Sequence, residues 1–418
     1  MVCSTAFVTL GRTQLEALGA PHTPIAVVPH PFGLRTRADI RAIAEQCVAD
    51  IVRLATGGED PTRRDRAASD DAPGARSIEV PADFEAFMAL CEAQCWGDGL
   101  PLVPPTPERV QTMLRHTHRA AAQSLAQVAP GFGTASVEAV AINAVMAGCK
   151  PEYLPVLIAA VEAMTDRAFN LQAIQATTNP ATPWLIVNGP IAQKLGINGG
   201  VGCMGQGTRA NSTLGRALRL ILQNIGGAHP GVMDRATQGQ PAKHTFCCAE
   251  NEAESPWAPL HTERGFDSER STVTVIGAAG TTNLNSHAKD ADDLLKAIAG
   301  SMAFPTSNDY HFGGAPWLAF SPEHAHILHA AGLDKAEVKR RLWEDSRLCA
   351  GRFAAKDYAR LQHTRGAELR GIGSDTLVPA SVHADEIGIV VAGGPGTHSV
   401  YVPTFGQTRA VTRPVDAT

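Results

Sequence analysis

Three short, largely apolar runs, each followed within two residues by glycine, constrain the fold of this chain most strongly. The runs are Trp184–Val187, Val273–Ile276 and Ile387–Val391. Apolar runs of this length between turn residues are typical of buried strands. Apolar periodicity predicts helices over 136–147 and 151–164, joined by a short connection as a helical hairpin. We therefore predict an α/β fold, in which ligands bind beyond the carboxyl ends of the strands.

A change of composition over residues 57–79 divides the chain into two unequal parts. This segment consists mainly of Gly, Pro, Asp and Arg with few apolar residues, which predicts a linker. Residues 1–56 are too few for a complete doubly wound domain, so we expect a small, truncated α/β module there. Residues 80–418 are expected to form one large mixed α/β domain that carries the active site.

Charge and hydropathy argue against several kinds of partner and location. The net charge is −5, and no broad basic field is present, so we expect no nucleic-acid partner. No apolar run reaches the roughly 18 residues of a membrane span, and the first residues do not resemble a signal peptide. The nine cysteines are odd in number and irregularly spaced. This pattern favours reduced thiols in a cytoplasmic protein over a disulfide scaffold.

The glycine-rich segment 199–207 is the strongest local indication of a site. Five of its nine residues are glycine, and a predicted helix follows from Ala210. Backbone N–H groups of such a loop can hold an anion, helped by the helix N-terminus and by Arg209. The pattern matches neither the phosphate-binding loop of nucleotide hydrolases nor the dinucleotide-binding fingerprint. The alternative interpretation is that the glycines only permit tight backbone packing.

Cys203, inside this loop, is the first candidate for a reactive cysteine. We expect its small glycine neighbours to leave the sulfur accessible, and a following helix N-terminus lowers the pKa of a thiol. The alternative is a small buried hydrophobe, which is the common state of free cysteine. Cys149, which lies between Gly148 and Lys150 at a predicted helix end, is a second candidate.

A second cluster of chemically active side chains lies in the segment 243–252. It combines a cation, an imidazole, two thiols and a carboxylate: Lys243, His244, Cys247, Cys248 and Glu250. In a strand, Cys248 and Glu250 would share one face and Cys247 the other. We expect Glu250 or His244 to transfer a proton, and Cys149 or Cys248 to act as a resolving thiol. The alternative is a buried strand with a solvated end.

Two residues next to the apolar runs extend the expected substrate site. Asn188 follows the first run, and Gly394 lies in the glycine-rich loop after the third. The predicted substrate-binding residues are therefore Gly202, Gly205, Gly207, Arg209, Asn211, Lys243, Asn188 and Gly394. The histidines of the segment 323–329 do not have the convergence that zinc sites usually need, so we assign no metal ligand. No motif identifies a cofactor.

Residues 7–56 resemble a known family. The motifs Leu18-Gly-Ala-Pro21 and Ile25-Ala-Val-Val-Pro-His-Pro-Phe-Gly33, with the helix after them, are similar to the UGSC family, whose members contain cysteine or selenocysteine. Segments from Trp96 to Gly396 also resemble the long C-terminal region of some members. The resemblance implies a redox motif, Gly-Ser-Cys, upstream of Phe7, which this sequence lacks. Either the start codon is placed too late or the module has lost its thiol chemistry, so no catalytic residue is transferred from the family.

Together these signals predict a cysteine-dependent enzyme, an oxidoreductase or lyase, that acts on a small anionic or polarised molecule. Its reaction would be thiol redox chemistry or cleavage of a carbon–heteroatom bond, with Cys203 as the nucleophile or redox thiol. A metal-assisted hydrolase or lyase and a non-catalytic structural or partner subunit remain as alternatives. The expected partners are a small-molecule substrate and either a second copy of the chain or a redox protein.

Overall fold

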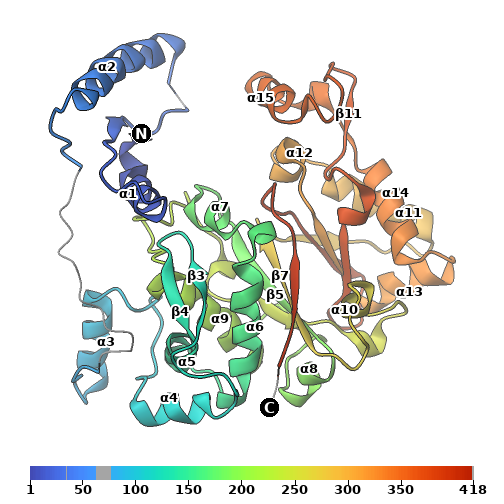
Figure 1. The fold of residues 1–418 in the computed structure, drawn as a ribbon. Helices are drawn as coiled ribbons and strands as arrows, with labels where there is room; N and C mark the ends of the chain where they lie inside the picture. The colour runs from blue at the N-terminus through green and yellow to red at the C-terminus, as the bar shows by residue number, and fades with distance from the viewer. Residues whose placement is uncertain (34, 63–76, 417–418) are drawn as a thin grey trace.

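The computed structural model describes residues 1–33, 35–62 and 77–416, and in Figure 1 a small N-terminal part stands apart from a larger body. Most of the predicted linker, residues 63–76, lies outside the described residues. Helices and strands mix in both parts, so the predicted α/β class is confirmed. Within the described ranges, no helix is long and apolar enough to cross a membrane.

The N-terminal module is a two-stranded parallel sheet with two helices. Strand β1 (Val2–Ser4) pairs with β2 (Ala26–Val28), and α1 (Val8–Ala17) and α2 (Arg37–Ala55) flank them. Thr36 and Asp39 form a capping box at the start of α2. Arg12 pairs with Asp60, which also accepts a hydrogen bond from the Ile25 amide at 3.1 Å. The packing of this module therefore continues past residue 57.

Two four-stranded sheets form the centre of the body. The first has the order β14-β7-β5-β6 and the second β12-β9-β13-β8. Their strands are β5 (Thr182–Asn188), β6 (Cys247–Ala249), β7 (Thr272–Ala278), β14 (Val411–Pro414), β8 (Thr282–Asn285), β9 (Trp317–Phe320), β12 (Gly388–Val391) and β13 (His398–Val402). The β5–β6 and β9–β12 pairs are parallel, and the other pairs are antiparallel. The three predicted apolar runs form β5, β7 and β12.

The two sheets pack on each other through their inner faces. Alternate residues of β5 and β9 meet there, with Trp184 and Trp317 rings 6.3 Å apart in an edge-on arrangement. A Cβ at Gly388 would lie 2.1 Å from the Trp317 ring, so only glycine fits at this position. The outer face of the first sheet is covered by α5 (Val137–Met146), α6 (Leu154–Met164) and α9 (Arg209–Asn224).

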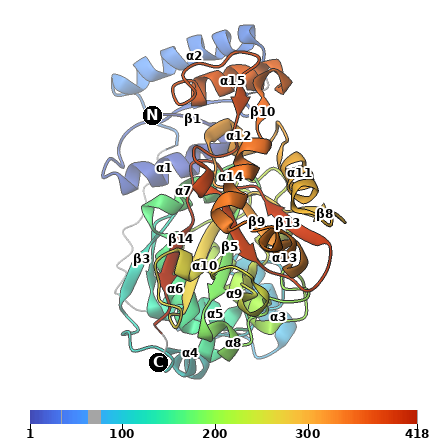
Figure 2. The same ribbon diagram turned by 90° about the vertical axis from the view of Figure 1, so that its right-hand side faces the viewer.

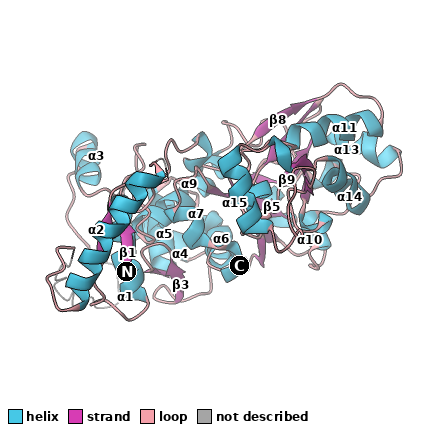
Figure 3. Cartoon of the chain, turned by 90° about the horizontal axis from the view of Figure 1, so that it is seen from above, coloured by secondary structure: helices cyan, strands magenta, loops and turns pink. Residues whose placement is uncertain are grey.

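The second sheet is covered on its outer face by α11 (Ala291–Met302), α13 (Pro322–Ala330) and α14 (Lys335–Asp345). The body thus has four layers: helices, sheet, sheet, helices (Figures 1 and 3). Figure 2 shows α13 and α14 in front of the strands they cover. The predicted helices over 136–147 and 151–164 are confirmed as α5 and α6, the latter preceded by a 3₁₀ turn at Pro151–Tyr153.

The remaining elements surround these layers. They are α3 (Phe84–Ala93), α4 (Pro107–Leu114), β3 (Ser124–Val128), β4 (Gly133–Ser136), α7 (Leu171–Ala176), α8 (Pro190–Lys194), α10 (Leu260–Glu263), α12 (Asn308–Phe312), β10 (Leu348–Cys349), α15 (Ala355–Arg365) and β11 (Leu377–Val378). Strands β3 and β4 form a hairpin, and β10 and β11 form an antiparallel pair although α15 lies between them in the chain. Lys356 of α15 donates a hydrogen bond to the Gly33 carbonyl, which links body and module.

Candidate functional site

The glycine-rich loop 199–207 closes the carboxyl ends of β6 and β12, which belong to different sheets. The Gly199 carbonyl accepts a hydrogen bond of 2.8 Å from the Gly393 amide, and the Asn251 amide donates to the Val391 carbonyl at 2.7 Å. A Cβ at Gly199 would lie 2.8 Å from the carbonyl oxygens of Ala249 and Glu250. Close backbone approach therefore explains this glycine, and the loop joins the two sheets at one end.

Other glycines of the loop have different physical reasons. Gly202 and Gly207 adopt φ of +68° and +109°, a region that favours glycine, whereas Gly205 has neither a positive φ nor a close neighbour. A Cβ at Gly394 would lie 3.1 Å from the Cα of Val201, so the loop after β12 rests directly on the glycine-rich loop. Two glycine loops that are distant in sequence thus meet at the same end of the sheets.

Asn211, in the first turn of α9, holds the glycine-rich loop in place. Its side-chain amide donates hydrogen bonds of 2.9 Å to the carbonyls of Asn198 and Cys203, and its oxygen accepts one of 2.8 Å from the Asn198 amide. These bonds use the polar atoms of the buried side chain within the protein. The structure therefore gives Asn211 a positioning function at Cys203, where the sequence predicted contact with substrate.

Cys203 lies in the core between the two sheets, and only 5% of it is exposed. The expectation that glycine neighbours leave the sulfur accessible is wrong, because Gly202 and Gly205 face solvent while the thiol turns inward. A hydrogen bond from the Cys248 thiol lowers the pKa of Cys203, and N–H groups of Cys203, Gly393 and Met204 lower it further against the effect of burial. Cys203 therefore loses its proton at lower pH than an ordinary cysteine does.

Cys248 is the hydrogen-bonding partner of Cys203 and is fully buried in the same inter-sheet core. Its pKa is raised well above the ordinary value by the hydrogen bond to Cys203 and by burial. The neighbouring Cys247 points to the opposite face of β6, into the core beneath the helices, together with Ala249. The predicted alternation of this strand is confirmed, and the structure brings Cys248 rather than Cys149 to Cys203.

Glu250 lies two residues beyond Cys248, where β6 ends. One carboxylate oxygen accepts hydrogen bonds from the Asn188 side chain at 2.6 Å and from the Leu260 amide at 2.7 Å. The other oxygen lies 3.9 Å from the Lys335 ammonium group. Burial raises the pKa of Glu250 in spite of these partners. Asn188 therefore positions a buried carboxyl group that exchanges protons closer to neutral pH than an ordinary glutamate does.

Arg209 and Cys149 lie away from the thiol pair. The Arg209 guanidinium donates hydrogen bonds of 3.1 and 2.9 Å to the Gly148 carbonyl, at a separate cavity of about 280 Å³. Cys149 lies in the core beneath the helices, donates to the Thr213 carbonyl at 3.3 Å, and has its pKa raised to about 12 by burial. The predicted function of Arg209 in the glycine loop and of Cys149 as a resolving thiol therefore has no geometric support.

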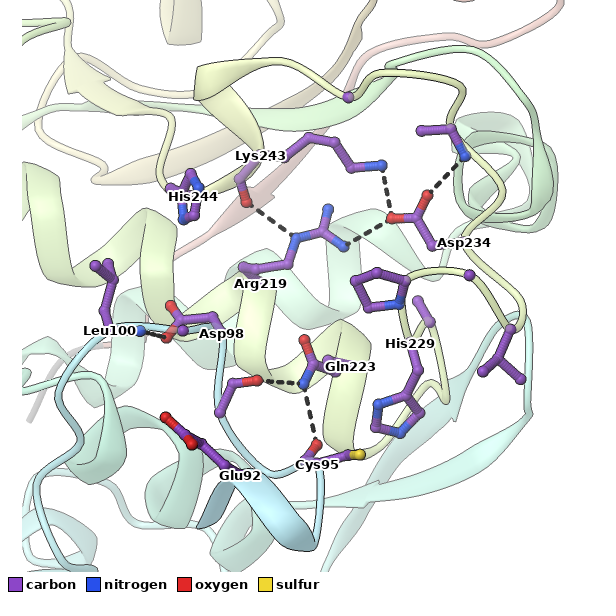
Figure 4. A pocket seen from close by; sticks show the side chains of 18 of the residues that line it. Glu92, Cys95, Asp98, Leu100, Arg219, Gln223, His229, Asp234, Lys243 and His244 are labelled. Carbon is purple, nitrogen blue, oxygen red and sulfur yellow. Dashed lines mark hydrogen bonds and ion pairs between the residues drawn. The ribbon is translucent and has the colours of Figure 1, made fainter. Parts of the chain in front are cut away.

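Lys243 and His244 precede β6 and line another cavity, shown in Figure 4. His244 is exposed, and the Lys243 ammonium group lies 2.6 Å from an Asp234 oxygen. Neither side chain faces the Cys203–Cys248 pair, which is enclosed between the sheets. The sequence grouped residues 243–250 into one cluster, whereas the structure divides them between two places.

The residues that the structure describes contain no group of three or more His, Cys, Asp and Glu side chains arranged to hold a metal ion. Ser321 caps helix α13, which carries the histidines of the segment 323–329. The ring of His324 contacts the Ser399 hydroxyl at 2.7 Å and the Ser286 carbonyl at 3.0 Å. This histidine is thus paired with a hydroxyl and a carbonyl.

Sequence reasoning missed two contributors to the site. The Gly393 N–H group, which donates to the Gly199 carbonyl, also contributes to the lowered pKa of Cys203, and Lys335 of α14 lies beside Glu250. The glycine-rich loop 392–396 was a usable signal for the first of these. Lys335 carries no local signal, because only the packing of α14 against the second sheet brings it to the end of β6.

Comparison with protein families identifies residues 1–57 as a match to the UGSC family. The resemblance predicted for residues 7–56 is thereby confirmed, and the chain has a UGSC-type N-terminal segment. Comparisons with curated proteins and with solved structures returned no match. The thiol pair and the two glycine loops lie outside the matched segment, so their function has to be argued from their own geometry.

Proposed function

We propose that this chain is a thiol-dependent oxidoreductase in which Cys203 and Cys248 alternate between dithiol and disulfide while a small hydroperoxide is reduced. The observation that supports this most directly is the hydrogen-bonded Cys203–Cys248 pair between the sheets. The two cysteines have opposite characters, since the pKa of Cys203 is lowered and that of Cys248 is raised. One is therefore suited to attack as a thiolate and the other to hold a proton.

In the first step, the Cys203 thiolate attacks the distal oxygen of the hydroperoxide and the O–O bond breaks. Cys203 becomes a sulfenic acid, and the leaving hydroxide or alkoxide takes up a proton to give water or an alcohol. We assign the supply of that proton to Glu250, which lies two residues beyond Cys248 along the chain. Its raised pKa keeps a larger protonated fraction than an ordinary glutamate has.

In the second step, the Cys248 sulfur attacks the Cys203 sulfenic acid, and an S–S bond replaces the S–O bond with release of water. The net change converts two thiols and one hydroperoxide into a disulfide, water and an alcohol or a second water. An external dithiol then reduces the disulfide by thiol–disulfide exchange and is itself oxidised. Because both sulfurs are enclosed, we propose that the glycine-rich loop 199–207 moves away from them in this step. Such a cycle requires a reducing compartment, and we propose a cytoplasmic location for it.

The choice of oxidant rests on access to the sulfur. Only 5% of Cys203 is exposed, so a bulky disulfide substrate cannot reach its sulfur while the sheets and the loop enclose it. A hydroperoxide is little larger than water. The N–H groups of Met204 and Gly393 stabilise negative charge at the sulfur before the reaction. Cleavage of a carbon–heteroatom bond would need an anion holder beside the thiolate, and Arg209 is engaged at Gly148.

The proposal is tested by oxidising the purified, reduced protein with one equivalent of hydrogen peroxide and mapping its disulfides by mass spectrometry. We expect a Cys203–Cys248 disulfide as the main product. With Cys248→Ser, the sulfenic acid on Cys203 should persist and react with dimedone. The matched control is Cys247→Ser, which changes the adjacent buried thiol on the opposite face of β6 and should still form the disulfide.

Two outcomes would contradict the proposal. One is a protein that keeps both thiols reduced after peroxide treatment while other cysteines oxidise. The other is equal behaviour of the Cys247→Ser and Cys248→Ser variants, since only the second removes a partner of Cys203. Circular dichroism and thermal unfolding of both variants establish that a difference between them does not arise from misfolding.

A further inference from the structure

A large cavity lies apart from the thiol pair. It has a volume of about 1070 Å³ and is enclosed by the end of α3, the segment 95–100, the second half of α9 and the segment 228–244 (Figure 4). Sites for small organic ligands typically have volumes of about 300–1,000 Å³. The cavity is therefore large enough for a metabolite-sized molecule.

One wall of the cavity carries two cations and one anion. The Lys243 ammonium group lies 2.6 Å and the Arg219 guanidinium 3.9 Å from the same Asp234 oxygen. A second acidic group, Asp98, accepts hydrogen bonds of 2.8 Å from Nε and Nη2 of the Arg216 side chain and is thereby neutralised. The Arg219, Lys243 and Asp234 cluster thus has a formal charge of +1.

These two cations have hydrogen-bond donors left for a ligand. Arg219 is 8% exposed, and three of its five N–H bonds point to the Lys243 carbonyl, Gln175 and Thr182. Lys243 has three N–H bonds and places its ammonium group against Asp234. Burial lowers the pKa of both side chains, which shows that their charges are only partly solvated. An anionic oxygen in the cavity would therefore gain charge-assisted hydrogen bonds.

The rest of the lining is largely apolar, apart from amide and imidazole groups and the exposed carboxylate of Glu92, which lies outside the cationic cluster. It includes Met88, Cys91, Leu100, Ala228, Pro230 and Val232. An apolar wall next to a cationic one selects a ligand that has an anionic head and a hydrocarbon body. A free inorganic anion would satisfy the cations but leave the apolar wall in contact with water.

We propose that this cavity binds a small organic carboxylate, with its carboxylate on Arg219 and Lys243 and its apolar body along Met88, Cys91 and Val232. The proposal rests on two features of one cavity: the desolvated cluster of Arg219, Lys243 and Asp234 with its formal charge of +1, and the apolar wall beside it. It goes beyond the redox function proposed above and does not depend on it.

Cys95 provides a built-in reporter for occupancy. It is an exposed cysteine on the cavity lining, and its carbonyl accepts a hydrogen bond of 3.1 Å from Gln223. A ligand in the cavity should shield its sulfur from alkylation. Cys47, on α2 of the N-terminal module, is partly exposed and remote in the fold, so it serves as the internal reference.

The experiment follows iodoacetamide labelling of Cys95 and Cys47 by mass spectrometry in the full-length protein with hexanoate, 1-hexanol or inorganic phosphate. Isothermal titration calorimetry measures the affinities in parallel. We expect saturating hexanoate to slow Cys95 labelling at least about fivefold relative to Cys47, and hexanol to have no such effect. Both measurements are repeated on Cys203→Ser, so that failure of the thiol chemistry cannot affect the result.

Two variants test the cationic wall. Lys243→Met and Arg219→Gln should each weaken hexanoate binding about tenfold or more, because each removes one charged donor. Arg340→Gln is the matched control, since Arg340 is exposed, pairs with Glu337 and Glu344, and lies outside the cavity lining. It should bind hexanoate like the unchanged protein. Lys243 is the less buried of the two and can be tested alone if Arg219→Gln fails to fold.

Three results would overturn the proposal. The first is protection of Cys95 by hexanol that equals the protection by hexanoate, because it would mean that the carboxylate is not recognised. Unchanged hexanoate affinity in a folded Lys243→Met variant would remove the cationic wall from the site. Protection by phosphate without protection by hexanoate would show that the cluster takes an inorganic or phosphate anion instead of a carboxylate.

Discussion

The thiol pair and the large cavity draw on the same two stretches of chain but have opposite physical characters. Segment 243–250 supplies Lys243 to the cavity and Cys248 to the thiol pair. The helix α9 supplies Arg219 to the cavity, and Asn211 in its first turn holds the loop that carries Cys203. The cavity is open and holds unneutralised charge, whereas the sulfurs are enclosed between two sheets.

This difference shows that closeness in sequence does not define a site in this fold. Residues 243–250 pass from the rim of the cavity into the centre of a sheet, so neighbours end in different environments. Within β6 the separation happens in one step, since Cys247 and Cys248 face different cores. Chemically active side chains that follow one another in a strand are therefore divided between the two faces of the sheet.

The largest expected effect tests the closed region. Cys203→Ser should reduce peroxide consumption, measured with dithiothreitol as reductant, on the order of 100-fold or more, because it removes the attacking sulfur. Cys149→Ser should change the rate less than about twofold, since Cys149 lies in a different core and its pKa is raised to about 12. If Cys149→Ser loses as much activity as Cys203→Ser, the reactive sulfur has been misassigned.

The next effect concerns pH. The hydrogen bond from Cys248 is the first cause of the lowered pKa of Cys203, so the thiolate persists to lower pH than that of an ordinary cysteine, whose pKa is 9.0. Cys248→Ala should move the midpoint of the rate of Cys203 oxidation by peroxide to higher pH. Each unit of that shift lowers the rate near neutrality about tenfold.

Cys247→Ala is the control for this pH profile, because it removes the adjacent thiol from the other face of β6. Its midpoint should match that of the unchanged protein. A midpoint that stays in place in Cys248→Ala would mean that the backbone N–H groups alone hold the thiolate, and the pairing of the two sulfurs would lose its importance.

A smaller effect compares two glycines of one loop. Gly199→Ala should lower the free energy of unfolding by about 1–3 kcal/mol, because its Cβ would press on two carbonyl oxygens at 2.8 Å. Gly205→Ala should change it by less than about 0.5 kcal/mol, since its nearest neighbour is 3.4 Å away. Urea unfolding of both variants measures the difference. Equal free energies of unfolding would show that the loop is not held by close backbone contacts at its first residue.

The smallest expected effect links the two regions. Saturating hexanoate should change the rate of Cys203 oxidation by less than about twofold while it slows Cys95 labelling, because the cavity and the thiol pair do not share a lining residue. Stopped-flow measurement of peroxide oxidation with and without hexanoate provides the comparison. A larger change would show that the cavity and the sulfurs are coupled through α9 or β6.

Local features of the fold could be predicted well from the sequence. The runs in β5, β7 and β12, the helices α5 and α6, and the capping box of α2 follow from short-range patterns, since apolar periodicity and caps act within a few residues. The stacking of two sheets did not follow, because the same alternation fits one sheet or two. Nothing in the run around Trp317 indicates that its ring packs against Trp184.

For the candidate site, the sequence identified Cys203, Cys248, Glu250 and Asn188 as residues capable of chemistry, because thiols, carboxylates and glycine loops are recognisable in isolation. It also included Arg209, Lys243, His244 and Cys149, which the structure places elsewhere. The two sets differ in the direction in which their side chains point. The type of a residue can be read from the sequence, but the side to which its side chain points depends on which layer covers each strand.

The sequence by itself determined the strands β5, β7 and β12, the helices α5 and α6, the alternation of Cys247 and Cys248 across β6 and the UGSC-type N-terminal segment, since each depends on residues near one another in the chain. Only the tertiary structure decided that Cys203 turns inward, that Gly393 and Cys248 meet its sulfur, and that Lys243 faces a separate cavity. The physical reason is that these contacts join segments from two sheets. Packing between layers fixes them, and short-range preferences do not.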